Sequence, residues 1–327
     1  MAIETKYVGA RKEIGFAKET TRGTVVDPAS GGWKPHEDFD FSPKVNKAAI
    51  TSASGSIADR EGAEIVQEWA EGSIPMLAAV EFMGDLANMI AGKAPDTSAS
   101  VGGGYYQHDW DALISNGNAN RHVSYTVTIK DPIAGGKQHA LAMLNTFSLE
   151  AGVDDFVKLA LNMIAKKEAS ATVNPTYSTT DSYFKPSALQ WFVASTYAGL
   201  TGATALPTSN ISVNGNKNAV PVFAHGSTQP EDIINQRLGF NGSFTLPYTN
   251  TTLRDYGLSD NYGALRLKLV RGTYVFQITF PSVDFSDWNH DPNREQFMPN
   301  TVTFNANYKD KTNGFCKIQV IDTASSH

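Results

Sequence analysis

The segments Glu71-Gly-Ser-Ile74 and Asn241-Gly-Ser-Phe244 resemble each other, and a proline follows each of them, Pro75 after the first and Pro247 after the second. Each segment leads into a short stretch that is helix-like or looped. A hydrophobic strand, a second strand and a closing strand with period-2 alternation then follow, in the same order both times. This order predicts two copies of one β-rich unit, as is typical of a building block of a symmetric assembly.

The two predicted units are separated at 169–182, where Ser, Thr, Asn and Pro give the chain a linker composition. Alternating apolar and polar residues close each unit, at 157–163 in the first and at 302–308 in the second. We therefore expect a mainly β protein with two tandem β-sandwich- or barrel-like units, 1–175 and 183–327. Each unit should contain at most one short helix.

Three stretches are predicted to be irregular. The polar segment 38–64 lacks sustained periodicity and predicts a long loop or a flexible hairpin arm, with a disordered insertion as the alternative. The segment 96–120 is rich in Ser, Gly and Asn and predicts a loop. Asn214-Gly215 is a hairpin-turn signal in the second unit.

The acidic composition limits the possible functions. The 327 residues carry a formal net charge of −6, with a pI of about 5.6, so the chain lacks the basic surplus of a protein that grips nucleic acid. The single cysteine, Cys316, rules out an intramolecular disulfide and fits synthesis in a reducing compartment. We see no signal peptide and no run of roughly 18 apolar residues that would cross a bilayer. We expect a soluble protein, made in the cytoplasm.

Few residues are arranged for chemistry. His108-Asp-Trp-Asp111 and Trp288-Asn-His-Asp291 place a histidine beside carboxylates, but neither has the spacing of a metal-ligand set, and both are predicted to lie in solvated loops. Gly102-Gly-Gly104 lacks the strand-to-helix context of a phosphate-binding loop. No Gly-x-Ser-x-Gly elbow occurs. Cys316 is expected to pack in the core. We predict no enzymatic activity, no cofactor and no metal.

Five segments together carry a resemblance to a known family. They are 15–24, 71–75, 84–92, 241–246 and 302–308. In this order they resemble the tail tube protein (major tail protein) of long-tailed, non-contractile bacteriophages, in its longer, internally duplicated type. The match runs over most of the chain. The joint order of the segments carries it, since no single motif is highly specific.

The resemblance implies a structural virion protein, made in the host cytoplasm, whose strands join those of neighbouring subunits into a barrel around a lumen. Stacked rings would form the tail tube and deliver DNA to the host. The implied partners are further copies of the chain and the tape-measure, tail-tip and tail-terminator proteins, while DNA passes without tight binding. Because two units can fill the places of two single-unit subunits, we expect a ring of three chains with pseudo-sixfold symmetry. A hexamer of one unit plus an added decoration domain is the alternative.

The resemblance also suggests where the contacts lie. The 38–64 arm is where this family reaches the next ring, so inter-ring contacts are expected from Phe39, Phe41, Lys44, Lys47, Asp59 and Arg60. Polar strand faces could line the lumen, with the residues Asn241, Ser243, Thr245, Thr301, Thr303 and Asn305. An uncharged polar lining suits the passage of DNA, because a basic one would hold the phosphates.

A carbohydrate-binding or adhesin-like β-protein of the virion or cell surface is the alternative function. The aromatic residues Tyr105, Tyr106, Trp110 and Trp288 look exposed and could stack on sugars. The aromatics are, however, spread through predicted strands, where such residues more often pack cores. A β-rich hydrolase is disfavoured because no nucleophile–base pair can be nominated.

Overall fold

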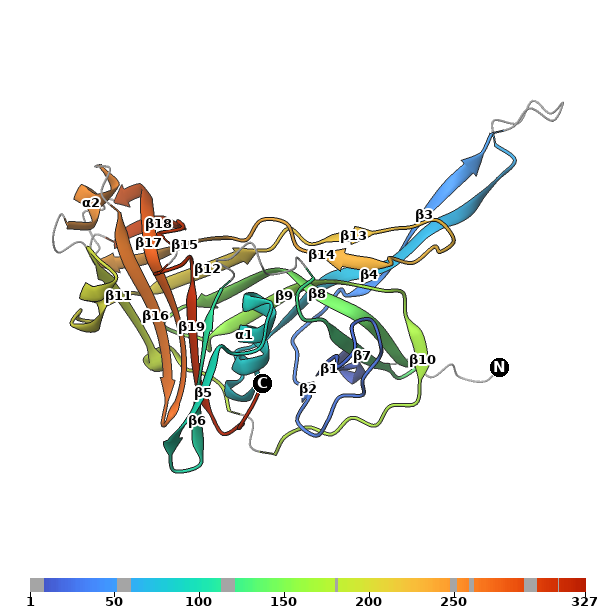
Figure 1. Cartoon of the computed structure of the whole chain (residues 1–327), viewed down its shortest axis with the longest axis horizontal. Coiled ribbons are helices and arrows are strands. Elements are labelled where there is room, and N and C mark those ends of the chain that lie inside the picture. Colours follow the sequence, from blue (N-terminus) through green and yellow to red (C-terminus); the bar gives the residue numbers. More distant parts are fainter. Residues whose placement is uncertain are drawn as a thin grey trace.

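The computed structural model describes residues 9–51, 60–112, 121–179, 182–247, 252–258, 262–290, 299–310 and 312–327. Within these residues the chain is mainly β, as the alternation predicted, with 17 strands in one connected antiparallel network and two in a separate hairpin. The α-helices described are α1 (Met83–Ala91) and α2 (Thr252–Gly257), each following a long strand. The molecule is elongated, and one hairpin projects from its end as an arm (Figure 1).

The strands fall into two consecutive sets. The first set is β1 (Glu13–Lys18), β2 (Trp33–Lys34), β3 (Ser42–Ile50), β4 (Gly62–Leu77), β5 (Thr97–Gly102), β6 (Tyr105–Asp111), β7 (Tyr125–Asp131), β8 (Gly135–Ala151), β9 (Lys158–Ala165) and β10 (Ala169–Ala171). The second set is β11 (Leu189–Ala194), β12 (Asn210–Asn216), β13 (Val220–Val222), β14 (Asp232–Ile234), β15 (Gly239–Pro247), β16 (Gly263–Arg271), β17 (Tyr274–His290), β18 (Pro299–Ala306) and β19 (Lys317–Asp322).

The same pattern of strand pairing occurs in both sets. In the first, β1 pairs with β7, β7 with β8, β8 with both β9 and β10, β9 with β4, and β4 with β3. In the second, β11 pairs with β16, β16 with β17, β17 with both β18 and β19, β18 with β15, and β15 with β12. Taken in chain order, these seven strands of each set therefore correspond one to one, and α1 after β4 corresponds to α2 after β15. The described strands β2, β5, β6, β13 and β14 lie outside this correspondence.

Register irregularities also fall at matching places. The β8–β9 register shifts just after the pair Leu144–Met163, and the β17–β18 register shifts just after the pair Phe285–Phe304. A shift of this kind marks a β-bulge, which inserts an extra residue into one strand. The two shifts therefore provide a residue-level alignment of the two sets, in which Met163 corresponds to Phe304.

In this alignment the Gly-Ser segment of β4 corresponds to the Gly-Ser segment of β15. Gly72 of β4 is opposite Met163, and Gly242 of β15 is opposite Phe304, so the two glycines correspond. The two prolines do not correspond: Pro75 pairs with Ala160 inside β4, whereas Pro247 lies at the last position of β15. Pro75 does not end its strand, because β4 continues to Leu77.

Each of the two corresponding glycines is crowded by a carbonyl oxygen of the segment next to it, and the two oxygens belong to equivalent residues. A Cβ on Gly242 would lie 2.1 Å from the Ser212 carbonyl oxygen, and a Cβ on Gly72 would lie 2.6 Å from the Asp40 carbonyl oxygen. Extending the β3–β4 register by one residue puts Phe41 opposite Gly72, as Val213 is opposite Gly242. Asp40, which precedes Phe41, is therefore equivalent to Ser212, which precedes Val213. Glycine is needed at both places because the neighbouring backbone leaves no room for a side chain.

Two segments expected to be irregular are strands. Much of 96–120 forms the β5–β6 hairpin, whose turn uses Gly102, Gly103 and Gly104 at positive φ (90°, 63° and 81°). Its Ser-rich composition predicted a loop, but pairing of β6 with the distant β19 overrides local propensity. Asn214-Gly215 lies inside β12 and makes no turn. The hairpin-turn signal was wrong because both residues are paired on both sides, with β8 and with β15.

One cluster of buried apolar residues forms the main core, and it includes residues of both sets. Its largest side chains include Trp33, Trp110 and Trp191, all fully buried. Cys316 is buried too, as expected. Helix α1 is almost wholly buried and is followed by Gly92 as its C-cap, whose φ of 75° lies in the left-handed region that glycine adopts readily.

Replacing Gly242 by Ala should destabilise the protein by about 2 kcal/mol or more, because the new methyl group meets the Ser212 carbonyl and the Phe304 ring. Urea denaturation followed by circular dichroism would measure the change. Gly239→Ala is the matched control in the same strand, since a Cβ there meets nothing within 4 Å. Equal stability of the two variants would contradict the close-approach argument.

Candidate functional site

The six polar residues expected to line a lumen lie on one face of the β15–β18 pair. They form three cross-strand pairs: Asn241 with Asn305, Ser243 with Thr303, and Thr245 with Thr301. Their side chains are exposed or half-buried. The intervening residues Phe244, Val302 and Phe304 face the core. The structure thus brings the six together on one surface, while their place in a lumen stays a prediction.

This polar face continues across both sets of strands. One row of directly opposed residues runs over β9, β8, β12, β15 and β18 as Ala160, Ser148, Asn214, Asn241 and Asn305. A parallel row runs over the same strands as Lys158, Glu150, Ser212, Ser243 and Thr303. Of the residues described on this face of β12, β15 and β18, none is charged. We call this surface the polar face.

The two sets are joined edge to edge through β8 and β12. These strands pair antiparallel from Ile211 opposite Ala151 to Asn216 opposite Thr146. The Lys217 amide donates to the Asn145 carbonyl at 2.8 Å and extends the ladder by one step. A second connection pairs β6 of the first set with β19 of the second. The backbone edges of the two sets therefore satisfy each other within one chain.

The β13–β14 hairpin of the second set also packs on the first set. The Glu68 main-chain amide donates to the carbonyl of Thr228, in the loop between β13 and β14, at 2.7 Å. The Trp69 and Phe223 rings meet edge to face, with centroids 6.1 Å apart. Arg22 forms an ion pair with Asp232 of β14 at 2.8 Å. The connection between the sets is therefore both a ladder and a packed, partly charged interface.

A buried lysine lies at the same connection. Lys217, directly after β12, is only 1% exposed and donates from Nζ to the Met89 carbonyl near the end of α1. Burial lowers the pKa of Lys217 to about 7. Burial, together with the charges of Lys217 and Arg22, also lowers the pKa of His122 to about 3. The interface therefore disfavours the charged forms of both groups.

The 38–64 segment is largely a β-hairpin in the part of it that the structure describes. β3 and the first half of β4 pair and project from the body (Figure 1). Four apolar side chains on this arm are exposed: Val45, Ile50, Ile65 and Val66. The sequence did not single out these four residues, because their spacing is neither helical nor strictly alternating. Exposed apolar residues on a projecting hairpin indicate a contact surface.

The residues expected to make inter-ring contacts have different environments. Lys44 is half-buried at the base of β3, while Lys47 and Arg60 are exposed on the arm. Phe41 is buried in the core and its ring meets His139 edge to face, so it is unavailable to a neighbouring subunit; that expectation was wrong. Phe39 is partly buried against the core. Asp59 lies outside the described residues.

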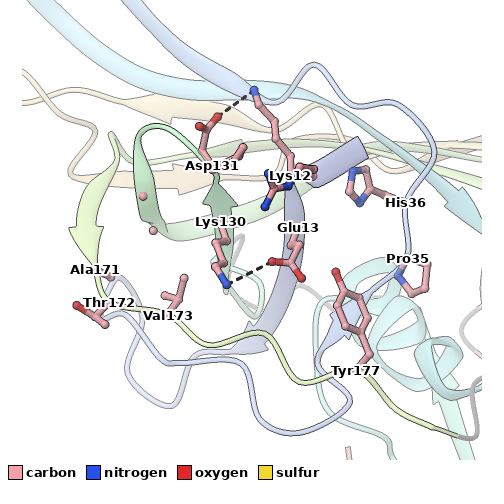
Figure 2. Close-up of a pocket in the computed structure, with 14 residues that line it drawn as sticks. Lys12, Glu13, Pro35, His36, Lys130, Asp131, Ala171, Thr172, Val173 and Tyr177 are labelled. Atoms are coloured by element: carbon pink, nitrogen blue, oxygen red, sulfur yellow. Dashed lines mark ion pairs between the residues drawn. The ribbon is translucent and has the colours of Figure 1, made fainter. Parts of the chain in front are cut away.

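A wide, open hollow lies beside β1, β7 and β10 (Figure 2). Its charged side chains are mostly paired: Lys12 with Asp131 at 3.3 Å, and Lys130 with Glu13 at 3.6 Å. The ring of Tyr177 borders it, with a pKa raised to about 12 by burial and by the nearby Glu13 charge. Within this lining, the charges of Lys12, Glu13, Lys130 and Asp131 are therefore balanced pairwise.

Of the two sequence motifs that place a histidine beside carboxylates, the structure describes the side chains of the one at 108–111. His108, expected in a solvated loop, is fully buried on β6 and is bonded through Nδ1 to Ser98 Oγ at 2.8 Å and through Nε2 to the Ala324 carbonyl at 2.9 Å. With Asp322 and His327 it forms a group whose ligand-type atoms lie within 4.8 Å of one another. These bonds tie the C-terminal segment to β6. The side chains of the Trp288 motif lie outside the described residues.

Of the aromatic residues proposed for sugar binding, the side chains of Tyr105, Tyr106 and Trp110 are described, and these three do not share one exposed surface. Trp110 is buried and donates from Nε1 to Asn88 Oδ1 at 3.1 Å. Tyr105 packs edge to face on Tyr274 with ring centroids 5.4 Å apart. The expectation that Trp110 is exposed was wrong, because strand alternation turns it into the core.

A family model described as "Phage tail tube protein" matches residues 9–307. The match covers most of the chain, so the protein belongs to the phage tail tube protein family and is a structural tail tube protein. No curated protein matches the chain. None of the helices in the described residues is long and apolar enough to span a membrane.

Stability should rise between about pH 7 and pH 10 through Lys217. In that range the unfolded chain still holds the lysine proton while the folded chain has released it, so raising the pH favours folding, by at most about 1.4 kcal/mol per pH unit. Lys217→Met should remove this rise. Urea denaturation at several pH values tests it, with Lys268→Met on β16 as the control. An unchanged pH profile in Lys217→Met would contradict the prediction.

Proposed function

We propose that this chain polymerises into stacked rings that form the tail tube of a bacteriophage and serve as the conduit for DNA ejection. The observation that carries the proposal is the polar face, which crosses from the first set of strands to the second without a break. A tube subunit needs an inner surface. The polar face carries no charged residue on β12, β15 and β18, and the charged residues of its second row, Lys158 and Glu150, are of opposite sign. A polar surface without a basic surplus, on an acidic chain, suits the transit of DNA without tight binding.

We further propose that the chain contains two tandem tail-tube units, 1–175 and 183–327, and that three chains build a pseudo-sixfold ring. The repeated order of strand pairings, the matching register shifts and the crowded glycines Gly72 and Gly242 support this duplication. The β8–β12 ladder, which joins a strand of the first set to a strand of the second, supports a side-by-side arrangement of the two proposed units. A hexameric ring remains the competing outcome of the test below.

The distal part of the arm is proposed to contact the next ring. It projects from the body beyond the Ala48–Glu64 pair, and Ile50 and Arg60 on this distal part are exposed, as is the neighbouring Lys47. Tape-measure, tail-tip and tail-terminator proteins are the proposed further partners, at the lumen and the tube ends. In this function the protein acts by assembly and catalyses no reaction.

Purified protein at high concentration should form rings or hollow tubes without nucleotide or metal. Negative-stain electron microscopy and light scattering, with and without EDTA, would show them, and native mass spectrometry would give the number of chains per ring. Three chains per ring are expected. Six chains would remove the pseudo-sixfold arrangement while leaving the tube. A monomer that fails to assemble in every buffer, even with tail-tip proteins present, would contradict the proposed function.

Shortening the arm should separate ring formation from tube growth. Replacing residues 49–63 by Asn-Gly would close β3 and β4 with a two-residue turn after the Ala48–Glu64 pair. Rings should still form, because the body of the subunit is untouched, but electron microscopy should show no long tubes. The unfolding midpoint serves as the control for an intact fold. Tubes of normal length would place the stacking contact elsewhere.

A further inference from the structure

The β8–β12 ladder inside the chain is a template for a contact between chains. At this ladder, the second half of the long strand of one set meets the outer strand of the other set. β8 uses the edge left open beyond β7, and β12 uses the edge opposite β15. The corresponding strands are β17 for β8 and β3 for β12.

Within the described residues, both corresponding edges are open. β3 pairs only with β4, and residues 284–290 of β17 pair only with β18. The two edges lie at opposite ends of the long axis of the molecule, β17 near α2 and β3 at the arm (Figure 1). They therefore cannot pair within one chain. Unpaired strand edges are strong templates for another chain.

The alignment of the two sets fixes the register such a contact would have. Thr146 follows the β8 shift as Asp287 follows the β17 shift, so Ser148 corresponds to Asn289. Aligned on the crowded glycines, Asn214 of β12 corresponds to Ser42 of β3. Because Asn214 is opposite Ser148 in the template, Ser42 of one chain should be opposite Asn289 of the next. By the same rule Lys44 should be opposite Asp287.

One position in this register differs from the template. Gly215 of β12 corresponds to Pro43 of β3. The Asp40 amide donates to the Ser73 carbonyl, so alternation turns the main chain of Pro43 away from β4 and toward the open edge. Proline has no N–H, so this contact would have one hydrogen bond fewer than the template. A proline on an open edge also limits unwanted pairing of the free subunit.

We propose that β3 of one chain adds antiparallel to residues 284–290 of β17 in a second copy, with Ser42 opposite Asn289, and so repeats between chains the β8–β12 ladder within each chain. The contact is head to tail, and head-to-tail contacts close into rings when the rotation allows. The polar face would then continue from chain to chain. This inference rests on the proposed ring assembly and specifies its interface.

Disulfide cross-linking in assembled tubes tests the register. Ser42→Cys with Asn289→Cys should link neighbouring chains under oxidised glutathione, because non-hydrogen-bonded antiparallel pairs bring Cα atoms within about 4.5 Å. Lys44→Cys with Asp287→Cys is a second variant in the same register and guards against a folding failure of the first. Non-reducing gels of a closed three-chain ring should end at a covalent trimer. Native Cys316 is buried and stays out of the reaction.

Two controls accompany these variants. Ser148→Cys with Asn214→Cys occupies the template pair and should form a disulfide within one chain, in the free subunit as well as in tubes. Asn46→Cys with Asn289→Cys shifts the register by four residues, about 13 Å, and should not link.

The outcomes separate the two proposals. Tubes without links in both in-register variants, or with equal links in the Asn46 variant, would overturn the β3–β17 contact and leave the tube function standing. The absence of rings or tubes from the unmodified protein would overturn the proposed function and this contact with it. Links in both in-register variants and none in the shifted one would support the interface.

Discussion

The backbone ladder between β8 and β12 is the constraint on which the rest of the structure depends. It joins the outer strand of the second set to the open edge of the first, from Ile211 opposite Ala151 to Asn216 opposite Thr146. Unpaired main-chain groups at a sheet edge destabilise the fold when they are buried, and they can pair with other chains when they are exposed. Pairing them within the chain joins the two sets of strands into one continuous surface. The polar face and the interface around Lys217 exist because of this ladder.

Close packing around two glycines makes that arrangement possible. At Gly72 and Gly242 a neighbouring carbonyl oxygen occupies the space that a side chain would need. The outer strand of each set can therefore approach its partner while the alternate residues keep their apolar sides in the core. On the opposite side, hydroxyl and amide groups face outward, as in the Thr245–Thr301 pair with hydroxyls 3.0 Å apart. The same strands serve as core on one side and as candidate lumen on the other.

Much of the fold and of the candidate site could be predicted from local patterns. Period-2 alternation marks β15 and β18 because each has one wet and one dry face, and this alone grouped Ser243 with Thr303. Long-range effects could not be predicted in this way. His108 in a polar motif is buried because β6 pairs with β19 more than two hundred residues away. Phe41 lies next to an arm yet packs in the core, since the arm begins only after it.

The sequence by itself determined the β class, the Gly-Ser correspondence between the two halves and the six residues of the polar pairs. These follow from residue size and from alternation, which act over neighbouring positions. Only the tertiary structure decided which edges meet: that β12 joins β8, that Asn214-Gly215 runs straight through a strand, and that β3 and β17 keep open edges. Edge pairing depends on main-chain hydrogen bonds, which every residue except proline offers alike. Side-chain identity therefore carries little record of the partner a strand will find.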